Sequence, residues 1–168
     1  MTGILGIDPG LSGALALLTP AGLEVWDMPV LQVMRNDKKR NTVDAVALGR
    51  LIDSISARVD TAVVELVGGM TGQSASAAFE FGRNVGIIYG ALAANFIPTE
   101  QVHPVKWKRA VGIKAAPKGE KPAKDESRAA ATRLMPAYSG LWTLVKHDGR
   151  AEAALIAHWG NTQARGAK

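Results

Sequence analysis

The first part of the chain consists of short apolar runs that alternate with turn residues. Residues 4–7 and 14–18 are apolar, and the segment 8–13 between them contains a proline and two glycines. Two such runs separated by turn residues predict a hairpin of adjacent strands. Residues 23–28 follow another turn and alternate as a half-buried strand does. We therefore expect three strands in an antiparallel meander.

The pattern then changes to a helix and a continuous apolar strand. Apolar residues within 48–55 follow the i, i+3, i+4, i+7 spacing of a helix, which Asn41 or Thr42 would cap. Residues 61–67 form an apolar run of the kind found in central strands that are covered on both faces. The order strand, helix, strand predicts that this strand lies parallel to the first.

A long helix that begins at Ser74 carries small residues at every fourth position. They are Ala78, Gly82, Gly86, Gly90 and Ala94. Each glycine inside a helix costs about 1 kcal/mol relative to alanine, so close approach to another element must compensate. We expect that element to be the sheet, with a dimer interface as the alternative.

The rest of the chain predicts one more strand and three helical segments. Residues 95–102 indicate a short strand, 104–109 a helical turn and 123–134 a helix that ends before Pro136. The last helix, within 146–159, has an acidic residue at or near its first turn.

These elements predict an α/β fold with a mixed five-stranded sheet, an antiparallel meander followed by parallel strands, flanked by helices. A chain of 168 residues fits one domain and is long enough to bury its own core. We expect that domain at residues 1–160 and a disordered tail at 161–168.

Composition favours a polyanionic partner and excludes sulfur ligands. The net charge is +5, and the basic residues concentrate in two segments, although a solvated basic face would look the same. Because cysteine is absent, oxygen-ligated metals remain but thiolate sites and disulfides do not. The first apolar run lacks the basic start of a signal peptide, and residues 85–97 are too short to span a bilayer. We expect a soluble protein with no membrane partner and no small-molecule cofactor.

The two basic segments are candidates for contacts with phosphates, which fix position without reading sequence. Residues 34–41 have no apolar periodicity and indicate an exposed basic loop, and residues 106–128 indicate a flexible basic segment. The candidate DNA-binding residues are Arg35, Lys38, Lys39, Arg40, Arg83, Lys106, Lys108, Arg109, Lys118, Lys121, Lys124 and Arg128.

Four acidic residues are expected to converge. Asp8 and Glu65 end neighbouring parallel strands, and Asp148 and Glu152 are four apart on one helix face, although an acid in a first helical turn also suits the helix dipole. Repulsion among them would be relieved by raised pKa values or by divalent cations, and Mg²⁺ or Mn²⁺ is the simpler answer. Two such ions can hydrolyse a phosphodiester, one activating water and the other stabilising the leaving oxygen, with Asp8 as the bridging ligand.

Five segments of the chain resemble, in order, the RuvC-type Holliday junction resolvases, and most closely their phage and plant-organellar branch. They are residues 6–14, 64–65, 81–86, 124–128 and 147–153. The resemblance implies a ribonuclease H-like fold, a homodimer and Mg²⁺-dependent paired nicks across a four-way DNA junction. It also implies that Asp8, Glu65, Asp148 and Glu152 are the metal ligands.

The chain departs from the bacterial members in two places. Their last two acids have the spacing Asp-x-x-Asp, whereas Asp148 and Glu152 are separated by three residues, as in the branch that the chain resembles. Their loop after the second acid carries an aromatic wedge, and this chain has Val67 and Met70 there. His147 is a further candidate for proton transfer or for contact with the scissile phosphate, the alternative being a capping or surface role.

Other functions stay open at this point. An actin-like or sugar-kinase phosphotransferase also begins with Asp-x-Gly, but that fold needs two halves and a longer chain. The chain could be a junction-binding module without catalysis, or another ribonuclease H-like nuclease acting on branched DNA, single strands or an RNA–DNA hybrid. The location we expect is the cytoplasm for a bacterial source and the host cytoplasm for a phage source. An organelle is a further alternative, although the chain shows no transit peptide.

Overall fold

A five-stranded mixed sheet forms the centre of the molecule in the computed structural model, which describes residues 3–35, 37–68, 72–114 and 125–166. The first three strands are an antiparallel meander, and the last two lie parallel to β1, in the order β3-β2-β1-β6-β7. The predicted antiparallel meander and the predicted parallel strand are both confirmed. The strands are β1 (Ile4–Asp8), β2 (Ala14–Thr19), β3 (Gly22–Asp27), β6 (Thr61–Glu65) and β7 (Thr99–Val102).

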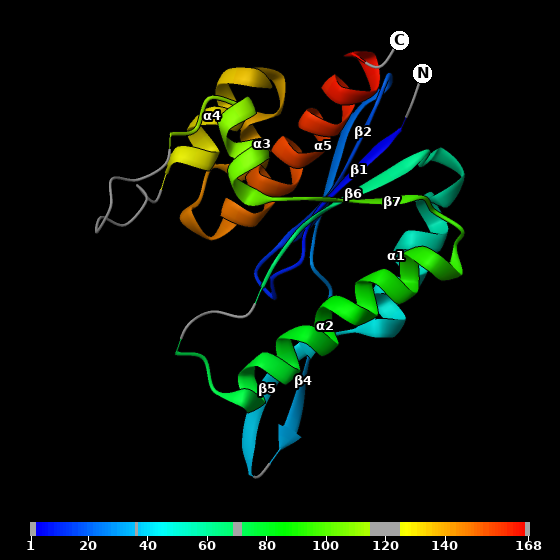
Figure 1. Ribbon diagram of the computed structural model, residues 1–168, viewed down its shortest axis with the longest axis vertical. Helices are drawn as coiled ribbons and strands as arrows, with labels where there is room; N and C mark the ends of the chain where they lie inside the picture. The colour runs from blue at the N-terminus through cyan, green and yellow to red at the C-terminus, as the bar shows by residue number, and fades with distance from the viewer. Residues whose placement is uncertain (1–2, 36, 69–71, 115–124, 167–168) are drawn as a thin grey trace.

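Helices cover the two faces of this sheet and enclose a separate hydrophobic core on each side (Figure 1). Along β2, Ala14 and Ala16 face the core of α5, whereas Leu15 and Leu17 face that of α1 and α2. At these two positions of β2 the side chains facing α5 are therefore small. The first face carries α3 (Pro104–Ala110), α4 (Glu126–Leu134) and α5 (Asp148–Gly166), with 3-10 turns at Pro136–Trp142 and Val145–His147; the second carries α1 (Ala45–Ile55), a 3-10 turn at Ser56–Arg58 and α2 (Ala75–Ala94).

Helix α5 lies directly on the sheet because glycines remove the side chains between them. A Cβ atom at Gly6 of β1 would be 2.3 Å from the carbonyl oxygen of Ala153 and 2.4 Å from the nitrogen of Ala157. At Gly149 it would be 2.4 Å from the carbonyl oxygen of Ser12, in the turn that follows β1. This close approach brings the first turns of α5 to the end of β1.

The glycines of α2 do not make the predicted approach to the sheet. A Cβ atom at Gly82, Gly86 or Gly90 would meet nothing within 4 Å, and all three residues are exposed. The helix packs through its opposite side instead, where Ile88 and Leu92 are buried. The expectation that the sheet compensates these glycines is therefore wrong.

Residues predicted as an exposed basic loop form a hairpin of two strands, β4 (Val30–Arg35) and β5 (Lys38–Val43). Buried Asn84 of α2 stabilises it, since its Oδ1 accepts hydrogen bonds from Thr42 Oγ1 at 2.9 Å and from the nitrogen of Val43 at 3.2 Å. Thr42 is therefore part of a strand. The N-cap of α1 is Asp44 and not Asn41 or Thr42.

The C-terminal helix is longer than the sequence predicts. Helix α5 continues to Gly166, so residues 161–166, expected to be a disordered tail, are helical. Helix α4 begins at Glu126, and the first residues of its predicted range lie outside the described residues. Among the helices that the structure describes, none combines the length and the hydropathy needed to cross a bilayer.

Candidate metal centre

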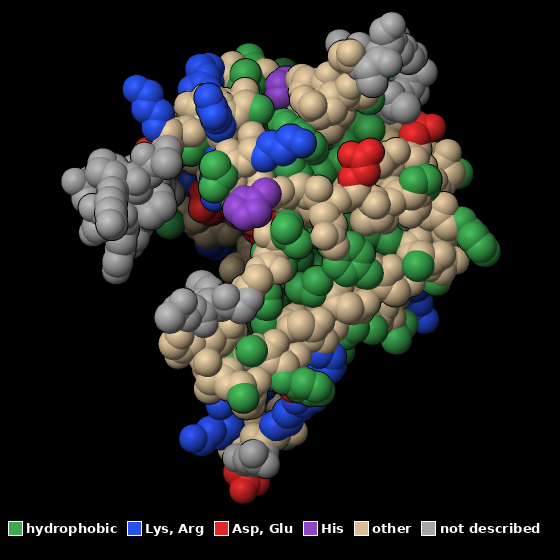
Figure 2. Space-filling view, in the orientation of Figure 1, with side chains coloured by type: hydrophobic (Ala, Val, Ile, Leu, Met, Phe, Trp, Pro, Cys, Tyr) green, Lys and Arg blue, Asp and Glu red, His purple; other side chains and the backbone are tan. Residues whose placement is uncertain are grey.

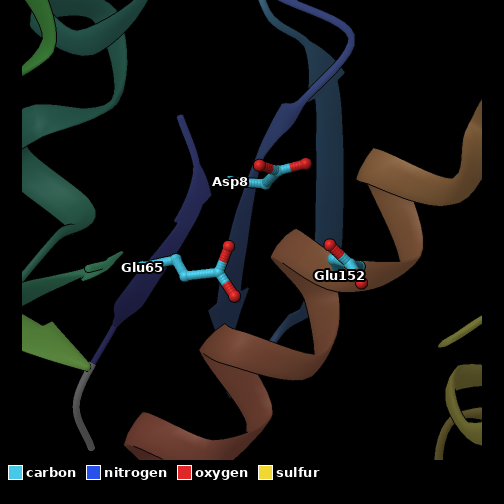
Figure 3. Close-up of side chains that lie close together, drawn as sticks. All are labelled: Asp8, Glu65 and Glu152. Carbon is cyan, nitrogen blue, oxygen red and sulfur yellow. The ribbon is translucent and has the colours of Figure 1, made fainter. Parts of the chain in front are cut away.

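Three of the four predicted acids meet at one edge of the sheet. Asp8 ends β1 and Glu65 ends β6, and the parallel register that pairs Ile7 with Val64 places them side by side. Glu152 reaches them from the second turn of α5. One carboxylate oxygen from each residue lies within 4.8 Å of the other two, and Figure 3 shows the three side chains directed at one another.

Side chains from α3 and α4 hold two of these acids in place. Trp107 Nε1 donates to Glu65 Oε1 at 2.9 Å, and both residues are buried. Ser127 Oγ donates to Glu152 Oε1 at 2.8 Å, and Lys108 Nζ lies 2.9 Å from the same oxygen. The sequence assigned no role to Trp107 or Ser127. A buried indole N–H needs a partner, which is the signal that could have identified Trp107.

The electrostatics of the three acids favour a bound cation. Burial, and then the charge of Glu152, raise the pKa of Asp8 to about 7, although the N–H of Gly10 donates to Asp8 Oδ1 at 3.2 Å and opposes the shift. Burial also raises the pKa of Glu65, against the hydrogen bond from Trp107. Crowded carboxylates that resist ionisation become stable anions when a divalent cation joins them. An all-oxygen donor set of this kind fits a hard cation such as Mg²⁺ or Mn²⁺.

Asp148 lies beside the group but is not one of the three residues that meet within 4.8 Å. It begins α5, one helical turn before Glu152. Its Oδ1 is buried and has no hydrogen-bond partner, and burial followed by the charge of Glu152 raises its pKa. Because buried polar atoms are almost always paired, this oxygen is available to a further ligand.

His147 lies away from the three acids, at the end of the 3-10 turn before α5. Its Nδ1 accepts from the nitrogen of Leu144 at 3.4 Å, which is the capping contact that the sequence left as an alternative. Partial desolvation, then the charges of Arg150 and Lys146, hold its pKa below the usual value. Among the described residues, His147 forms no hydrogen bond or ion pair with the three acids.

Sequence comparison alone identifies no relative. The chain matches no protein-family model, and no curated protein sequence matches it. Solved structures do match. T. thermophilus RuvC in complex with a Holliday junction substrate aligns with a TM-score of 0.64 at 15% identity, over 98% of this chain and 96% of that chain. A second T. thermophilus RuvC structure aligns with a TM-score of 0.59 at 17% identity, over 99% and 97%.

This chain has the RuvC fold. The likeness extends over almost the whole length of both proteins, so the predicted ribonuclease H-like architecture is confirmed. At such low identities the shared feature is the fold. What the fold does in this chain must be argued from its own side chains.

The predicted DNA-binding residues differ in how free they are to contact phosphates. Lys38, Lys39 and Arg40 are exposed on β5, and Lys106 and Arg109 are exposed on α3. Figure 2 accordingly shows blue side chains near α3 and α4 and again around the hairpin.

Four other basic residues of the set are engaged within the chain. Arg35 and Arg83 form ion pairs with Glu80, Arg128 pairs with Asp125, and Lys108 pairs with Glu152. Lys118, Lys121 and Lys124 lie outside the described residues.

The segment after Glu65 lines an apolar pocket of about 250 Å³. Val67, one of the two residues that replace the expected aromatic, contributes to its wall together with Phe81 and Pro104. Met70, the other, lies outside the described residues. An aromatic side chain thus lies next to this segment, although it comes from α2.

Proposed function

We propose that this protein is a structure-selective DNA endonuclease that resolves four-way junctions by paired symmetric nicks. The observation that carries the proposal is the group of Asp8, Glu65 and Glu152 at the strand ends of a RuvC fold. The similar T. thermophilus protein was solved with a Holliday junction substrate. Clustered acids repel a polyanion, so the presence of three favours catalysis over a binding module.

The chemistry assigned to this site is phosphodiester hydrolysis. Bound Mg²⁺, with Mn²⁺ as a substitute and two ions in each site, would activate water and stabilise charge at the phosphate. Asp8, Glu65 and Glu152 would hold these ions, and the unpartnered Oδ1 of Asp148 supports that residue as a fourth ligand. Trp107 would keep Glu65 in one orientation throughout.

Exposed lysines and arginines would bring the DNA to the acids. The hairpin contributes Lys38, Lys39 and Arg40, and α3 contributes Lys106 and Arg109. Side chains of this kind contact backbone phosphates and carry no sequence information. The preference for junctions would therefore come from shape, because a four-way junction presents several phosphate backbones to separate basic surfaces.

Paired nicks need two active sites, and the outward face of α2 offers a surface for a second copy of the chain. Phe79 is 70% exposed, and Gly82, Gly86 and Gly90 follow it along the same side of the helix. Figure 2 shows this face largely without charged side chains. Two such faces would pack about a twofold axis, since the same surface would be used by both copies.

The experiment that tests the function compares substrates. A four-way junction, a flap, a linear duplex and an RNA–DNA hybrid are incubated with the protein in Mg²⁺. We expect cleavage of the junction at two positions symmetric about the crossover, and little cleavage of the duplex. Preference for the hybrid would indicate a ribonuclease, and binding without cleavage of any substrate would indicate a junction-binding module.

A further inference from the structure

Two neighbouring residues of α3 contact two different acids of the metal centre. Trp107 Nε1 donates to Glu65 Oε1, and Lys108 Nζ lies 2.9 Å from Glu152 Oε1. The same ammonium lies 5.1 Å from the centroid of the Trp107 ring. Lys108 is therefore held between an aromatic face and a carboxylate.

Among the described residues, Lys108 is the one basic side chain that forms an ion pair with this acidic group. Its single positive charge meets a group of three carboxylates, because one oxygen each of Asp8, Glu65 and Glu152 lie within 4.8 Å of one another. One ammonium cannot neutralise three carboxylates that lie this close together. A divalent cation would compensate the group better, but its charge would repel an ammonium bound to the same carboxylate.

The geometry allows Lys108 to leave. Its side chain is 35% exposed and carries its ammonium on a flexible four-carbon stem. Trp107 is fully buried and does not depend on it. Ser127 would remain hydrogen-bonded to Glu152 after the ammonium had moved, so the carboxylate keeps its orientation.

We propose that Lys108 is an exchangeable counter-ion: it neutralises Glu152 in the metal-free protein, and the divalent cation displaces it toward the DNA phosphate. This inference rests on the proposed function, because it requires the acids to bind a divalent cation. It also reconciles the two roles of Lys108, which the sequence predicts to bind DNA and which the structure pairs with an acid.

The first test measures Mn²⁺ affinity by calorimetry in the full-length protein. Lys108→Met removes the charge and keeps most of the apolar stem, so we expect Mn²⁺ to bind about tenfold more tightly. Lys108→Arg keeps the charge and should bind within about twofold of wild type. Lys106→Met is the matched control, since it removes the same charge two residues away, where the ammonium lies over Trp159. Unchanged or weaker binding by Lys108→Met would overturn the inference.

The second test needs no variant. Lysine acylation followed by mass spectrometry reports how accessible each ammonium is, and Mn²⁺ should increase labelling of Lys108 severalfold while leaving Lys106 unchanged. Constant labelling of Lys108 at saturating Mn²⁺ would show that the lysine stays in place. If wild-type protein binds no Mn²⁺, the proposed function fails. If it binds Mn²⁺ and either test fails to respond as expected, only the exchange of Lys108 fails.

Discussion

Two helices rich in glycine and alanine lie on opposite faces of the sheet, and they use their small residues in opposite ways. On α5, Ala153 and Ala157 are fully buried and touch β1 at Gly6. On α2, Gly86 and its neighbouring glycines face open space. Small residues thus signal that something approaches closely, but they do not identify the partner. In α5 the partner is the sheet, and we propose that in α2 it is a second copy of the chain.

The difference has a functional consequence. Close contact between α5 and β1 carries Glu152 to within 4.8 Å of Asp8 and Glu65, so the packing of this helix builds the candidate metal centre. The packing of α2 leaves the acids unaffected and positions the β4–β5 hairpin through Asn84. Changes on the two helices should therefore separate chemistry from assembly.

The largest expected effect is the loss of an acid on the α5 side. Asp8→Asn should lower junction cleavage by about a thousandfold or more, beyond the 10–100-fold typical of losing an outer-shell partner of a metal. Binding to the junction should be kept or become tighter, because a negative charge is removed. Gel-shift and cleavage assays in Mg²⁺ measure both. Asp53→Asn, an exposed position on α1, is the control, and normal cleavage by Asp8→Asn would contradict the site assignment.

Adding a methyl group between α5 and the sheet should also be severe. Gly6→Ala places a Cβ 2.3 Å from a backbone oxygen of α5, which cannot rotate away. We expect a loss of about 2–4 kcal/mol in the free energy of unfolding, measured with urea, together with reduced cleavage. Gly49→Ala in α1 is the matched control: its Cβ meets nothing within 4 Å, so stability should rise by up to about 1 kcal/mol. Equal stabilities of the two variants would argue against the close contact.

Removing the hydrogen bond that supports Glu65 should give an intermediate effect. Trp107→Phe keeps an aromatic ring but loses the N–H that donates to Glu65 Oε1. Metal affinity should fall about 10–100-fold, since outer-shell donors orient their ligands. Trp142→Phe is the matched control, because it is the same substitution at an indole that donates to Thr132 of α4 and not to an acid. If Trp142→Phe weakened Mn²⁺ binding as much as Trp107→Phe, Trp107 would have no special role.

The smallest effect on the fold is expected on α2. Gly86→Arg extends a charged side chain into open space and replaces a glycine inside a helix, so the free energy of unfolding of a single chain should not fall and should rise by up to about 1 kcal/mol. The same change should convert a dimer to monomers in analytical ultracentrifugation and uncouple the two nicks. A Gly86→Arg protein that stays dimeric would place the interface elsewhere.

The features that could be predicted from the sequence depend on local patterns. Apolar runs and turn residues predict the hairpin of β1 and β2, and continuous apolar residues predict the parallel strand β6. Since parallel strands end at the same edge, Asp8 and Glu65 were expected to be neighbours, and they are. The helix that carries Glu152 was also expected, and the group of acids followed from these elements.

The remaining features depend on contacts between distant segments. Residues 34–41 lack apolar periodicity, and the hairpin that contains them is held in part by a buried polar residue, Asn84, which no local pattern reveals. Contacts of Trp107 and Ser127 with the acids depend on how α3 and α4 pack on α5. Asp148 shares a helix face with Glu152 but lies one turn away along the axis, about 6 Å, and helical spacing alone does not reveal which turn faces the strand ends.

The most direct test of the account is the position of Mn²⁺ in crystals of the wild-type protein, located by its anomalous scattering. The account predicts a peak coordinated by carboxylate oxygens of Asp8, Glu65 and Glu152, with α5 in contact with β1 as described. A peak that none of these three acids coordinates, or an empty site at Mn²⁺ concentrations that support junction cleavage, would contradict it.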